Sequence, residues 1–248
     1  MPSFPDHFSG SAALYASHRP TYPAELFGWL AETTERHERA WDCGTGNGQA
    51  AVGLAAHFGE VVATDPSPAQ LAHATRAERI HYVAMTAEDG ALASRSVQLI
   101  TVAQALHWFK LPRFYAEVAR VLVPGGTLAV WTYGLLSISP EIDVLIGSFY
   151  RDTLRGYWPP ERALVDAGYS GVPFPFAERA APVFRMTRNW TLAQLSGYLD
   201  TWSAVSEFRR VNGENPVGRF VAALEPMWGD RATARRVTWP LELKVGTT

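Results

Sequence analysis

The sequence has very little cysteine: Cys43 is the single one among 248 residues. One cysteine excludes a framework of internal disulfides, and a chain so poor in thiols is typical of a reducing compartment. Cys43 has no evident histidine partner, which favours a small buried residue over a nucleophile. The seven histidines show no spacing that groups them as metal ligands, so we predict no metal site.

The sequence also lacks an excess of charge of either sign. It has 22 Lys and Arg against 24 Asp and Glu, which gives a formal net charge of −2. A protein whose main partner is nucleic acid usually has a basic face. Arg231, Arg235 and Arg236 are close in sequence, but three charges indicate a surface helix rather than a binding face. We therefore predict no nucleic-acid partner.

Long hydrophobic runs are missing as well. The most apolar stretch, residues 97–109, is interrupted by Gln98, Thr101, Gln104 and His107, so it is too short and too polar to span a bilayer. The first 20 residues lack the basic start and apolar run of a secretion signal. These absences predict a cytoplasmic protein with no membrane partner, and they leave the oligomeric state open.

The first half of the chain alternates short β-rich runs with helical patterns. Strands are expected at 40–42, 60–64, 80–85, 97–103 and 127–132, and helices at 49–58, 69–77 and 111–122. Repeated strand–helix–strand units indicate crossover connections and a mostly parallel sheet. In the second half, helices are expected at 138–155 and 192–208, and late strands at 184–186 and 238–245.

We therefore predict an α/β, Rossmann-like fold. Its seven-stranded, mostly parallel sheet has helices on both faces and a helical cap over its carboxyl edge. The whole chain, 1–248, is expected to form one domain. Its parts are an N-terminal arm and first helix (1–35), a cofactor-binding core (36–132), cap helices with a late strand (133–235) and a final strand (236–248).

Three glycines at every second position stand out in the stretch "AWDCGTGNGQ", residues 40–49. A dinucleotide fingerprint, G-x-G-x-x-G, would need a third glycine where Gln49 stands. A P-loop would need a lysine after its last glycine, and none follows Gly48. The spacing therefore disfavours both of the common phosphate-binding loops.

Asp42 followed by Gly44, Gly46 and Gly48 resembles the first motif of the class I S-adenosylmethionine-dependent methyltransferases. The resemblance implies that this turn holds the methionine and ribose parts of the cofactor. Asp65, at the end of the second expected strand, matches the family's acidic residue for the ribose hydroxyls. An ionised carboxylate only accepts hydrogen bonds, as a diol requires.

Three more stretches of residues 36–132 follow in the family's order. Ala87 and Glu88 (or Asp89) match the pair that brackets the adenine. The stretch "AQALHWF", residues 103–109, matches the fourth motif and includes Gln104 as a cofactor-binding candidate. "VLVPGGTLAVW", residues 121–131, resembles the helix–turn–strand segment that follows. One departure is Gln98, because the family commonly has an aspartate near the start of this strand.

The flanking segments resemble a small-molecule subgroup similar to trans-aconitate methyltransferase. The N-terminal stretch "YASHRPTYP", 15–23, carries this likeness, with Trp190-Thr191 and "TWSAV", 201–205, in the cap. The resemblance implies an arm that folds over the cofactor and brings Tyr15, Arg19 and Tyr22 near its methionine end. Arg19 would pair with the cofactor carboxylate.

The catalytic candidate is His107, just past the fourth expected strand. It can act as a general base for a hydroxyl or amine acceptor, or it can be a histidine hydrogen-bonded to the cap or to the cofactor loop. A carboxylate acceptor needs no base, and Arg151, Arg155 or Arg188 can then orient it unless these residues only cover a solvated helix face. Aromatic residues available to wall the site, or simply to pack in the core and cap, are Trp108, Trp131, Tyr133, Tyr157, Trp158 and Trp202.

The predicted function is methyl transfer from S-adenosylmethionine to a small-molecule acceptor, at a carboxylate or hydroxyl oxygen. Two alternatives stay open at the level of sequence. One is a nicotinamide-dependent oxidoreductase, which the residue at Gln49 disfavours. The other is a protein that binds S-adenosylmethionine without catalysing a reaction.

Overall fold

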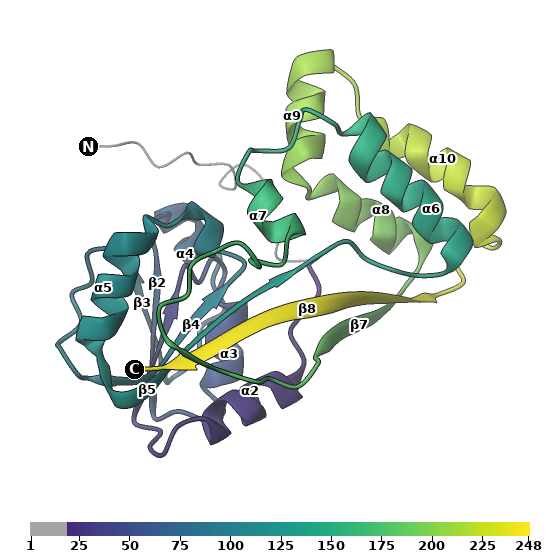
Figure 1. The fold of residues 1–248 in the computed structure, drawn as a ribbon. Coiled ribbons are helices and arrows are strands. Elements are labelled where there is room, and N and C mark those ends of the chain that lie inside the picture. The colour runs from purple at the N-terminus through teal and green to yellow at the C-terminus, as the bar shows by residue number, and fades with distance from the viewer. Residues whose placement is uncertain (1–18) are drawn as a thin grey trace.

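The computed structural model describes residues 19–248. It contains a twisted sheet with helices on both faces and a group of helices that extends to one side (Figure 1). The strands are β1 (Arg39–Cys43), β2 (Glu60–Asp65), β3 (Ile80–Ala84), β4 (Val97–Ala103), β5 (Leu122–Tyr133), β6 (Ala177–Arg179), β7 (Arg185–Trp190) and β8 (Arg235–Thr247).

The helices fall into a group that covers the sheet and a group that forms the cap. Those that cover the sheet are α2 (Ala24–Glu32), α3 (Gln49–Leu54), α4 (Pro68–Ala72) and α5 (Leu111–Val121). Those that follow β5 are α6 (Pro140–Ser148), α7 (Arg162–Asp166), α8 (Leu192–Asp200), α9 (Ser203–Asn212) and α10 (Pro216–Trp228). A 3₁₀ turn (Leu106–Trp108) follows β4, and a π-helical turn (Phe149–Thr153) continues α6.

The sheet has the strand order β3-β2-β1-β4-β5-β8-β6. Strands β1 to β5 run parallel, and β8 joins β5 antiparallel. The predicted α/β fold class with a mostly parallel sheet is therefore confirmed. Within residues 19–248 the sheet has eight strands rather than seven. The additional strand, β6, is three exposed residues of sequence Ala-Glu-Arg, so no hydrophobic pattern marks it.

Strands β1 and β4 lie side by side in the sheet, although β2 and β3 come between them in the sequence. The chain crosses from β1 to one side of the sheet and from β4 to the other. Such a switch point leaves a crevice at the carboxyl ends of the two central strands, where ligands bind in open α/β sheets. The glycine-rich turn follows β1 and the "AQALHWF" stretch follows β4, so both lie at this crevice.

Apolar residues that alternate along the strands build one core on each face of the sheet. Helices α2 and α3 cover one face, where Leu30 and Leu54 are fully buried. Helix α5 covers the other with Phe114, Val118 and Val121, each fully buried. These three residues are spaced three and four apart, as on one face of a helix.

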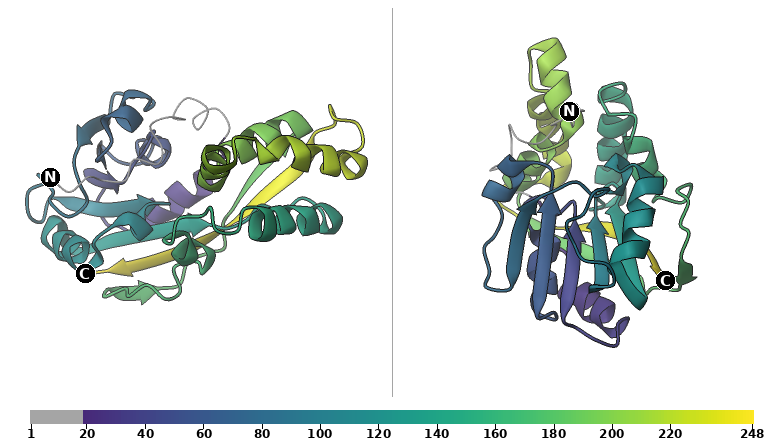
Figure 2. Two further views of the ribbon diagram at one scale, coloured as in Figure 1. Left: turned by 90° about the horizontal axis from the view of Figure 1, so that it is seen from above. Right: turned by 90° about the vertical axis from the view of Figure 1, so that its left-hand side faces the viewer.

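The cap stands on a two-stranded ribbon that β7 and the first half of β8 form beyond the sheet (Figure 2). The predicted helix 138–155 is α6 with its π-helical turn, and the predicted helix 192–208 is broken into α8 and α9. The break lies at Thr201 and Trp202, where the Thr201 hydroxyl donates to the Tyr198 carbonyl over 2.6 Å. Trp202 has an extended backbone and is 5% exposed. Helix α8 therefore ends next to a buried residue.

Within residues 19–248, no helix is both long and apolar enough to cross a membrane. The same part of the chain contains no group of three His, Cys, Asp or Glu side chains placed to hold a metal ion.

Candidate functional site

The glycine-rich turn after β1 has a left-handed backbone at each of its three glycines. Gly44, Gly46 and Gly48 have φ of 71°, 57° and 85°, values that residues with a Cβ rarely adopt. The backbone amides of Gly44 and Thr45 donate to the Thr64 carbonyl over 2.8 and 2.9 Å. The turn is thereby fixed to the end of β2, and Gly48 caps the start of α3.

The three glycines are required for different reasons. A Cβ on Gly44 would lie 2.6 Å from the Cβ of Ala105, and one on Gly48 would lie 2.1 Å from the Tyr82 hydroxyl oxygen. A Cβ on Gly46 would meet no protein atom within 4 Å, and Gly46 lines a cavity of about 900 Å³. Gly44 and Gly48 therefore serve close packing, whereas Gly46 leaves space that a ligand can fill.

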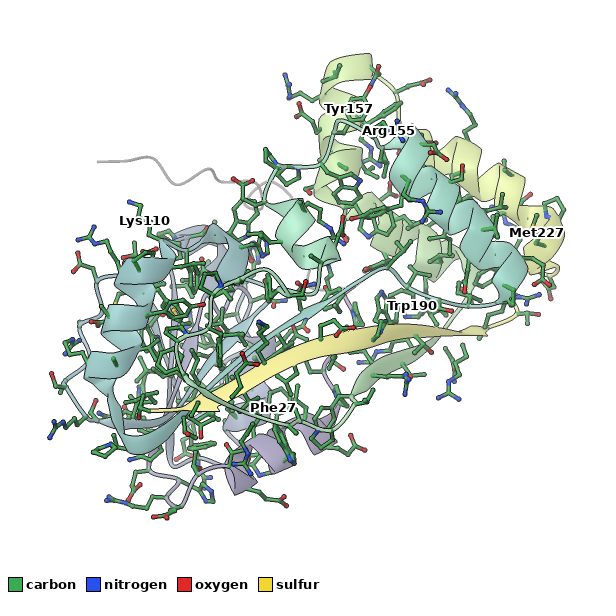
Figure 3. The ribbon with its side chains drawn as sticks, in the orientation of Figure 1. Phe27, Lys110, Arg155, Tyr157, Trp190 and Met227 are labelled. Atoms are coloured by element: carbon green, nitrogen blue, oxygen red, sulfur yellow. The ribbon has the colours of Figure 1, made fainter. Side chains whose placement is uncertain are left out.

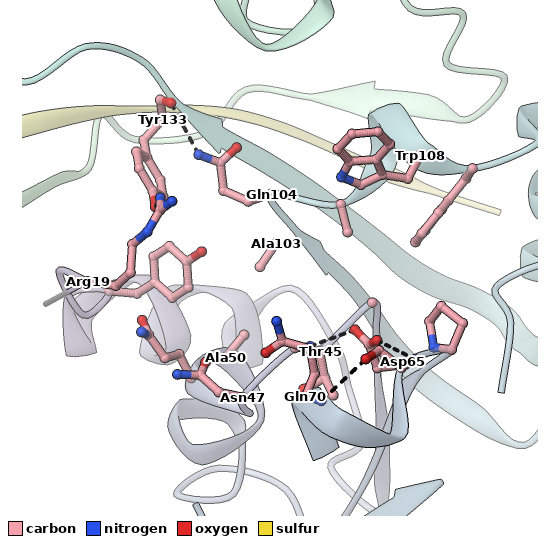
Figure 4. Close-up of a pocket in the computed structure, with 18 residues that line it drawn as sticks. Arg19, Thr45, Asn47, Ala50, Asp65, Gln70, Ala103, Gln104, Trp108 and Tyr133 are labelled. Carbon is pink, nitrogen blue, oxygen red and sulfur yellow. Dashed lines mark hydrogen bonds between the residues drawn. The ribbon is translucent and has the colours of Figure 1, made fainter. Parts of the chain in front are cut away.

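Asp65, at the end of β2, lines the same cavity. Its Oδ2 accepts the amide of Gly46 and its Oδ1 accepts the amide of Ser67, each over 2.9 Å (Figure 4). The two amides hold the carboxylate in one orientation beside the glycine turn. A carboxylate offers about four acceptor positions, so it can also accept two hydroxyls of a ligand diol.

Asp42 lies behind the glycine turn rather than in the lining of the cavity. It is fully buried, and its carboxylate accepts the hydroxyls of Thr45 over 2.5 Å and Thr101 over 2.8 Å. Burial raises the pKa of Asp42 to about 6, and the two hydroxyls oppose that rise. Among the described residues, Thr45 lines the cavity and Asp42 does not. Asp42 therefore supports the glycine turn from behind and would act on a ligand only through that turn.

The other predicted cofactor residues are spread over different places. Tyr15 lies outside the described residues. Ala87 is buried in the α5-side core, and the Glu88 carboxylate accepts the Lys110 amide over 2.8 Å; the cavity lining includes neither. Gln104 and Arg19 do line the cavity.

Gln104 has a left-handed backbone with φ of 54°, which is uncommon for a residue with a side chain. Its side-chain amide donates to the Tyr133 carbonyl over 3.2 Å, and its side-chain oxygen accepts the Thr132 hydroxyl. The Arg19 guanidinium donates to the Tyr133 hydroxyl over 2.7 Å and lies 5.6 Å from the centre of the Tyr198 ring. These contacts gather Gln104 and Arg19 at one end of the cavity (Figure 4).

A second chamber of about 690 Å³ opens at that end. Arg19, Gln104, Trp108 and Tyr133 line both spaces, so the two adjoin each other. We call the larger space, lined by Gly46 and Asp65, the cofactor chamber, and the second the acceptor chamber. Aromatic rings from the cap complete the acceptor chamber: Trp158, Tyr198 and Trp202.

The acceptor chamber has basic side chains in its lining. Arg19 and Arg162 line it, and its described lining contains no Asp or Glu. Arg162 begins α7; its Nε donates to the Tyr150 hydroxyl over 2.7 Å and lies 3.0 Å from the Asp166 carboxylate. The guanidinium is 5.0 Å from the Trp158 ring centre. These contacts hold Arg162 in place from the cap side.

Arg162 was not among the arginines that the sequence suggested. Arg151 and Arg155 are exposed, and Arg155 lies at the top of the cap (Figure 3). Arg188 donates to the Thr21 hydroxyl instead of entering the chamber. The available signal was limited to the spacing of Arg162 and Asp166, four residues apart, which pairs a guanidinium with a carboxylate on one side of a helix.

His107 lines the acceptor chamber on the 3₁₀ turn after β4. Its Nδ1 lies 2.8 Å from the hydroxyl of Tyr169, a residue of the segment that follows α7. Burial, with a smaller contribution from Arg162, lowers the pKa of His107 to about 3. A hydrogen bond to the cap region was one of the two roles left open by the sequence, and this contact is present.

Two features of the cofactor chamber fit an adenosyl cofactor. Gly46 has no Cβ and so leaves space for a ligand next to the Asp65 carboxylate, which suits a ribose diol. The side-chain oxygen of Gln70 is buried and has no hydrogen-bond partner among residues 19–248. Buried polar atoms are nearly always hydrogen-bonded in native proteins, so a donor from a ligand is expected there. Sequence reasoning did not identify Gln70, because one glutamine in a helix carries no pattern.

Replacing Gln70 by methionine tests this expectation. Methionine has a similar shape without the buried oxygen, so the melting temperature should stay the same or rise. If the oxygen accepts a hydrogen bond from the cofactor, affinity for S-adenosylhomocysteine should fall by about three- to tenfold. Calorimetric titration measures this change, and an unchanged affinity would remove Gln70 from the cofactor site.

Alanine at Gly46 and at Gly44 should have separable effects. Gly46→Ala adds a methyl group to the cofactor chamber at a positive φ, which costs about 1–2 kcal/mol of stability. We expect affinity for S-adenosylhomocysteine to fall at least tenfold while the melting temperature falls by only about 5 °C. Gly44→Ala forces its methyl against the Ala105 methyl and should lower the melting temperature further. Thermal unfolding with and without S-adenosylhomocysteine distinguishes the two, and equal behaviour would contradict the assignment.

Comparison with known proteins agrees with this geometry. The family model described as "Methyltransferase domain" matches residues 41–130, which include the glycine turn, Asp65 and the "AQALHWF" stretch. A protein of Dictyostelium discoideum named as a methyltransferase is 35% identical over 216 residues, 86% of this chain and 82% of that protein. A Saccharomyces cerevisiae protein named as an S-adenosylmethionine-dependent methyltransferase is 30% identical over 139 residues, 52% of this chain and 46% of that protein.

The likeness extends to a solved structure. A protein of Anaeromyxobacter dehalogenans described as a Type II methyltransferase superposes with a TM-score of 0.87 and 44% sequence identity, covering 92% of this chain and 97% of that chain.

Proposed function

Because the chain belongs to the S-adenosylmethionine-dependent methyltransferases, we propose that it methylates a carboxylate oxygen of a small molecule with an apolar or aromatic body. The observation that carries this proposal is the acceptor chamber. Its described lining combines two arginines with aromatic rings and has no carboxylate. Such a chamber attracts an anion, and a guanidinium binds a carboxylate in a planar, often bidentate contact.

The arrangement of the two chambers supports transfer at their junction. Bound S-adenosylmethionine supplies an activated methyl group, so the protein has to align the acceptor and exclude water. Gly46 and Asp65 would hold the adenosyl part at one end, and Arg19, Gln104, Trp108 and Tyr133 line the passage to the acceptor. Arg162 would hold the acceptor carboxylate from the cap side. The rings of Tyr198 and Trp202, 3% and 5% exposed, restrict water in the acceptor chamber.

Charge and proton balance favour a carboxylate over a hydroxyl. A carboxylate oxygen forms the new bond to the methyl carbon as the carbon–sulfur bond breaks and its electrons go to sulfur. No proton is transferred in this step. A hydroxyl acceptor would have to lose a proton, and His107, whose pKa is about 3, accepts protons poorly near neutral pH.

The N-terminal and cap stretches resemble those of proteins similar to trans-aconitate methyltransferase. This likeness agrees with an anionic acceptor. In that likeness, Arg19 pairs with the cofactor carboxylate. Its place at the junction, against Tyr133 and Tyr198, also allows contact with the acceptor. We propose the small-molecule class of acceptor because the lining of the chamber is largely apolar and aromatic with a few polar groups, as is typical of small-ligand sites.

Matched acceptors test the proposal. Phenylacetate, 2-phenylethanol and phenylacetamide share one aromatic body and differ in the group offered to the chamber. With S-adenosylmethionine present, release of S-adenosylhomocysteine should be detectable with phenylacetate and absent with the other two. Turnover of the alcohol equal to that of the acid would contradict a carboxylate acceptor.

A further inference from the structure

His107 presents two different edges to its surroundings. Its Nδ1 lies against the hydroxyl of Tyr169, which is 1% exposed and does not line the acceptor chamber. His107 itself does line that chamber. The ring edge opposite Nδ1, which carries Nε2, is therefore the edge that faces the chamber. No residue in the described part of the chain hydrogen-bonds to Nε2.

The Tyr169 hydroxyl decides where the hydrogen of the neutral imidazole lies. A buried hydroxyl must donate its hydrogen to an acceptor or lose about 1–3 kcal/mol. Of the groups near this hydroxyl, the backbone amides of Leu106 and His107 can only donate, and the Thr132 hydroxyl already bonds to Gln104. Nδ1 of His107, 2.8 Å away, is the acceptor we assign to it. Nδ1 therefore accepts, and a neutral imidazole whose Nδ1 accepts carries its hydrogen on Nε2.

Both groups keep these protonation states near neutral pH. Burial raises the pKa of Tyr169 above its ordinary value, so its hydroxyl stays protonated. Burial and the charge of Arg162 hold the pKa of His107 near 3, so the imidazole stays neutral. The hydrogen bond assigns the tautomer, and burial keeps the imidazole neutral.

We propose that Tyr169 is a positioning residue that holds His107 as a neutral donor, with its Nε2–H directed at the acceptor carboxylate. The proposal rests on the carboxylate acceptor proposed above. It gives the chamber three donors to one anion: the guanidinium groups of Arg19 and Arg162 and the imidazole of His107. It also replaces the general-base role that the sequence left open, because Nε2 already carries a hydrogen and cannot take another without becoming charged.

The titratable and charged groups around His107 do not alter this assignment between pH 6 and 8.5. Those that line the chamber are Arg19, Arg162, Tyr133 and Tyr198, and Tyr169 contacts the ring from behind. The arginines stay positive over this range. The pKa of Tyr198 is raised by burial, so it stays neutral. An imidazole near two positive charges should show no titration there.

The direct test is a long-range ¹H–¹⁵N spectrum of the histidine-labelled protein with S-adenosylhomocysteine bound. His107→Gln identifies the His107 signals by their loss. We expect the Nε2–H tautomer with no titration from pH 6 to 8.5. In Tyr169→Phe the Nδ1 acceptor loses its donor, so the signals should move toward a mixture of tautomers. An Nδ1–H tautomer in the unmodified protein, or titration within this range, would overturn the proposal.

Benzoate, added to the same protein, provides the second measurement. His107→Gln keeps an amide donor near the position of Nε2 but offers no base, so the benzoate dissociation constant should stay within about threefold. His107→Ala removes the donor and should raise it by about tenfold. Loss of benzoate binding in His107→Gln equal to that in His107→Ala would overturn the donor role. An Nε2–H tautomer in a protein that binds no benzoate would instead contradict the proposed acceptor class.

Discussion

Asp65→Ala is expected to reduce affinity for S-adenosylhomocysteine on the order of 1,000-fold, which leaves no saturable binding at ordinary protein concentrations. Each hydrogen bond to a charged group contributes about 1.5–3 kcal/mol, and a ribose diol would make two to this carboxylate. The same substitution frees the amides of Gly46 and Ser67, which the carboxylate holds over 2.9 Å. The glycine turn therefore loses its support together with the ligand contact.

Two control variants separate ligand binding from folding in this experiment. Asp152→Ala removes a carboxylate from the exposed side of the cap, where it accepts the Ser148 hydroxyl over 2.9 Å, and should leave affinity unchanged. Asp65→Asn keeps one side-chain oxygen and should give an intermediate loss. Calorimetric titration gives the affinities, and circular dichroism checks that each variant is folded. If folded Asp65→Ala binds as well as the unmodified protein, the cofactor lies elsewhere.

Arg162→Gln is expected to raise the KM for a carboxylate acceptor on the order of 100-fold, with a smaller change in kcat. The guanidinium would contribute one or two charge-assisted hydrogen bonds to the acceptor, which amounts to about 2–4 kcal/mol. Binding of the adenosyl cofactor should change little, because Arg162 lines only the acceptor chamber. Steady-state kinetics with phenylacetate measures both constants.

Arg155→Gln is the matched control for this substitution. It removes the same charge from an exposed site of the cap, where the Arg155 Nε donates to the Arg151 carbonyl over 3.4 Å. Long-range attraction of an anionic acceptor would be weakened by both variants, whereas a direct contact would be lost in Arg162→Gln alone. Equal KM values in the two variants would show that Arg162 does not touch the acceptor.

Local patterns made the cofactor half of the molecule predictable. The glycine spacing after β1 distinguished this turn from the common phosphate-binding loops, and the turn lies in the lining of the cavity. Alternation of strands and helices determined the parallel sheet, which places Gly46 and Asp65 at one edge because parallel strands end there. Asp42 shows the limit of this reasoning, because sequence position alone does not reveal that Thr45 stands between it and the cavity.

The acceptor half was less predictable for a physical reason. Its residues come from separate parts of the chain, and their meeting depends on tertiary packing rather than on local spacing. Arg162 enters the chamber because α7 is placed against Tyr150 and Trp158, contacts that no periodicity encodes. The break between α8 and α9 lies where Trp202 is buried, and a helical pattern read through residues 192–208 does not show it.

The chemical nature of the methylated product tests the central claim most directly. The protein, given S-adenosylmethionine with a radiolabelled methyl group and phenylacetate, should release a labelled product. A methyl ester is cleaved by mild alkali to labelled methanol, whereas methyl groups on ether oxygen, nitrogen or carbon are not. The account predicts that the transferred label becomes volatile after alkaline treatment. Label that stays bound to a non-volatile product would contradict methyl transfer to a carboxylate.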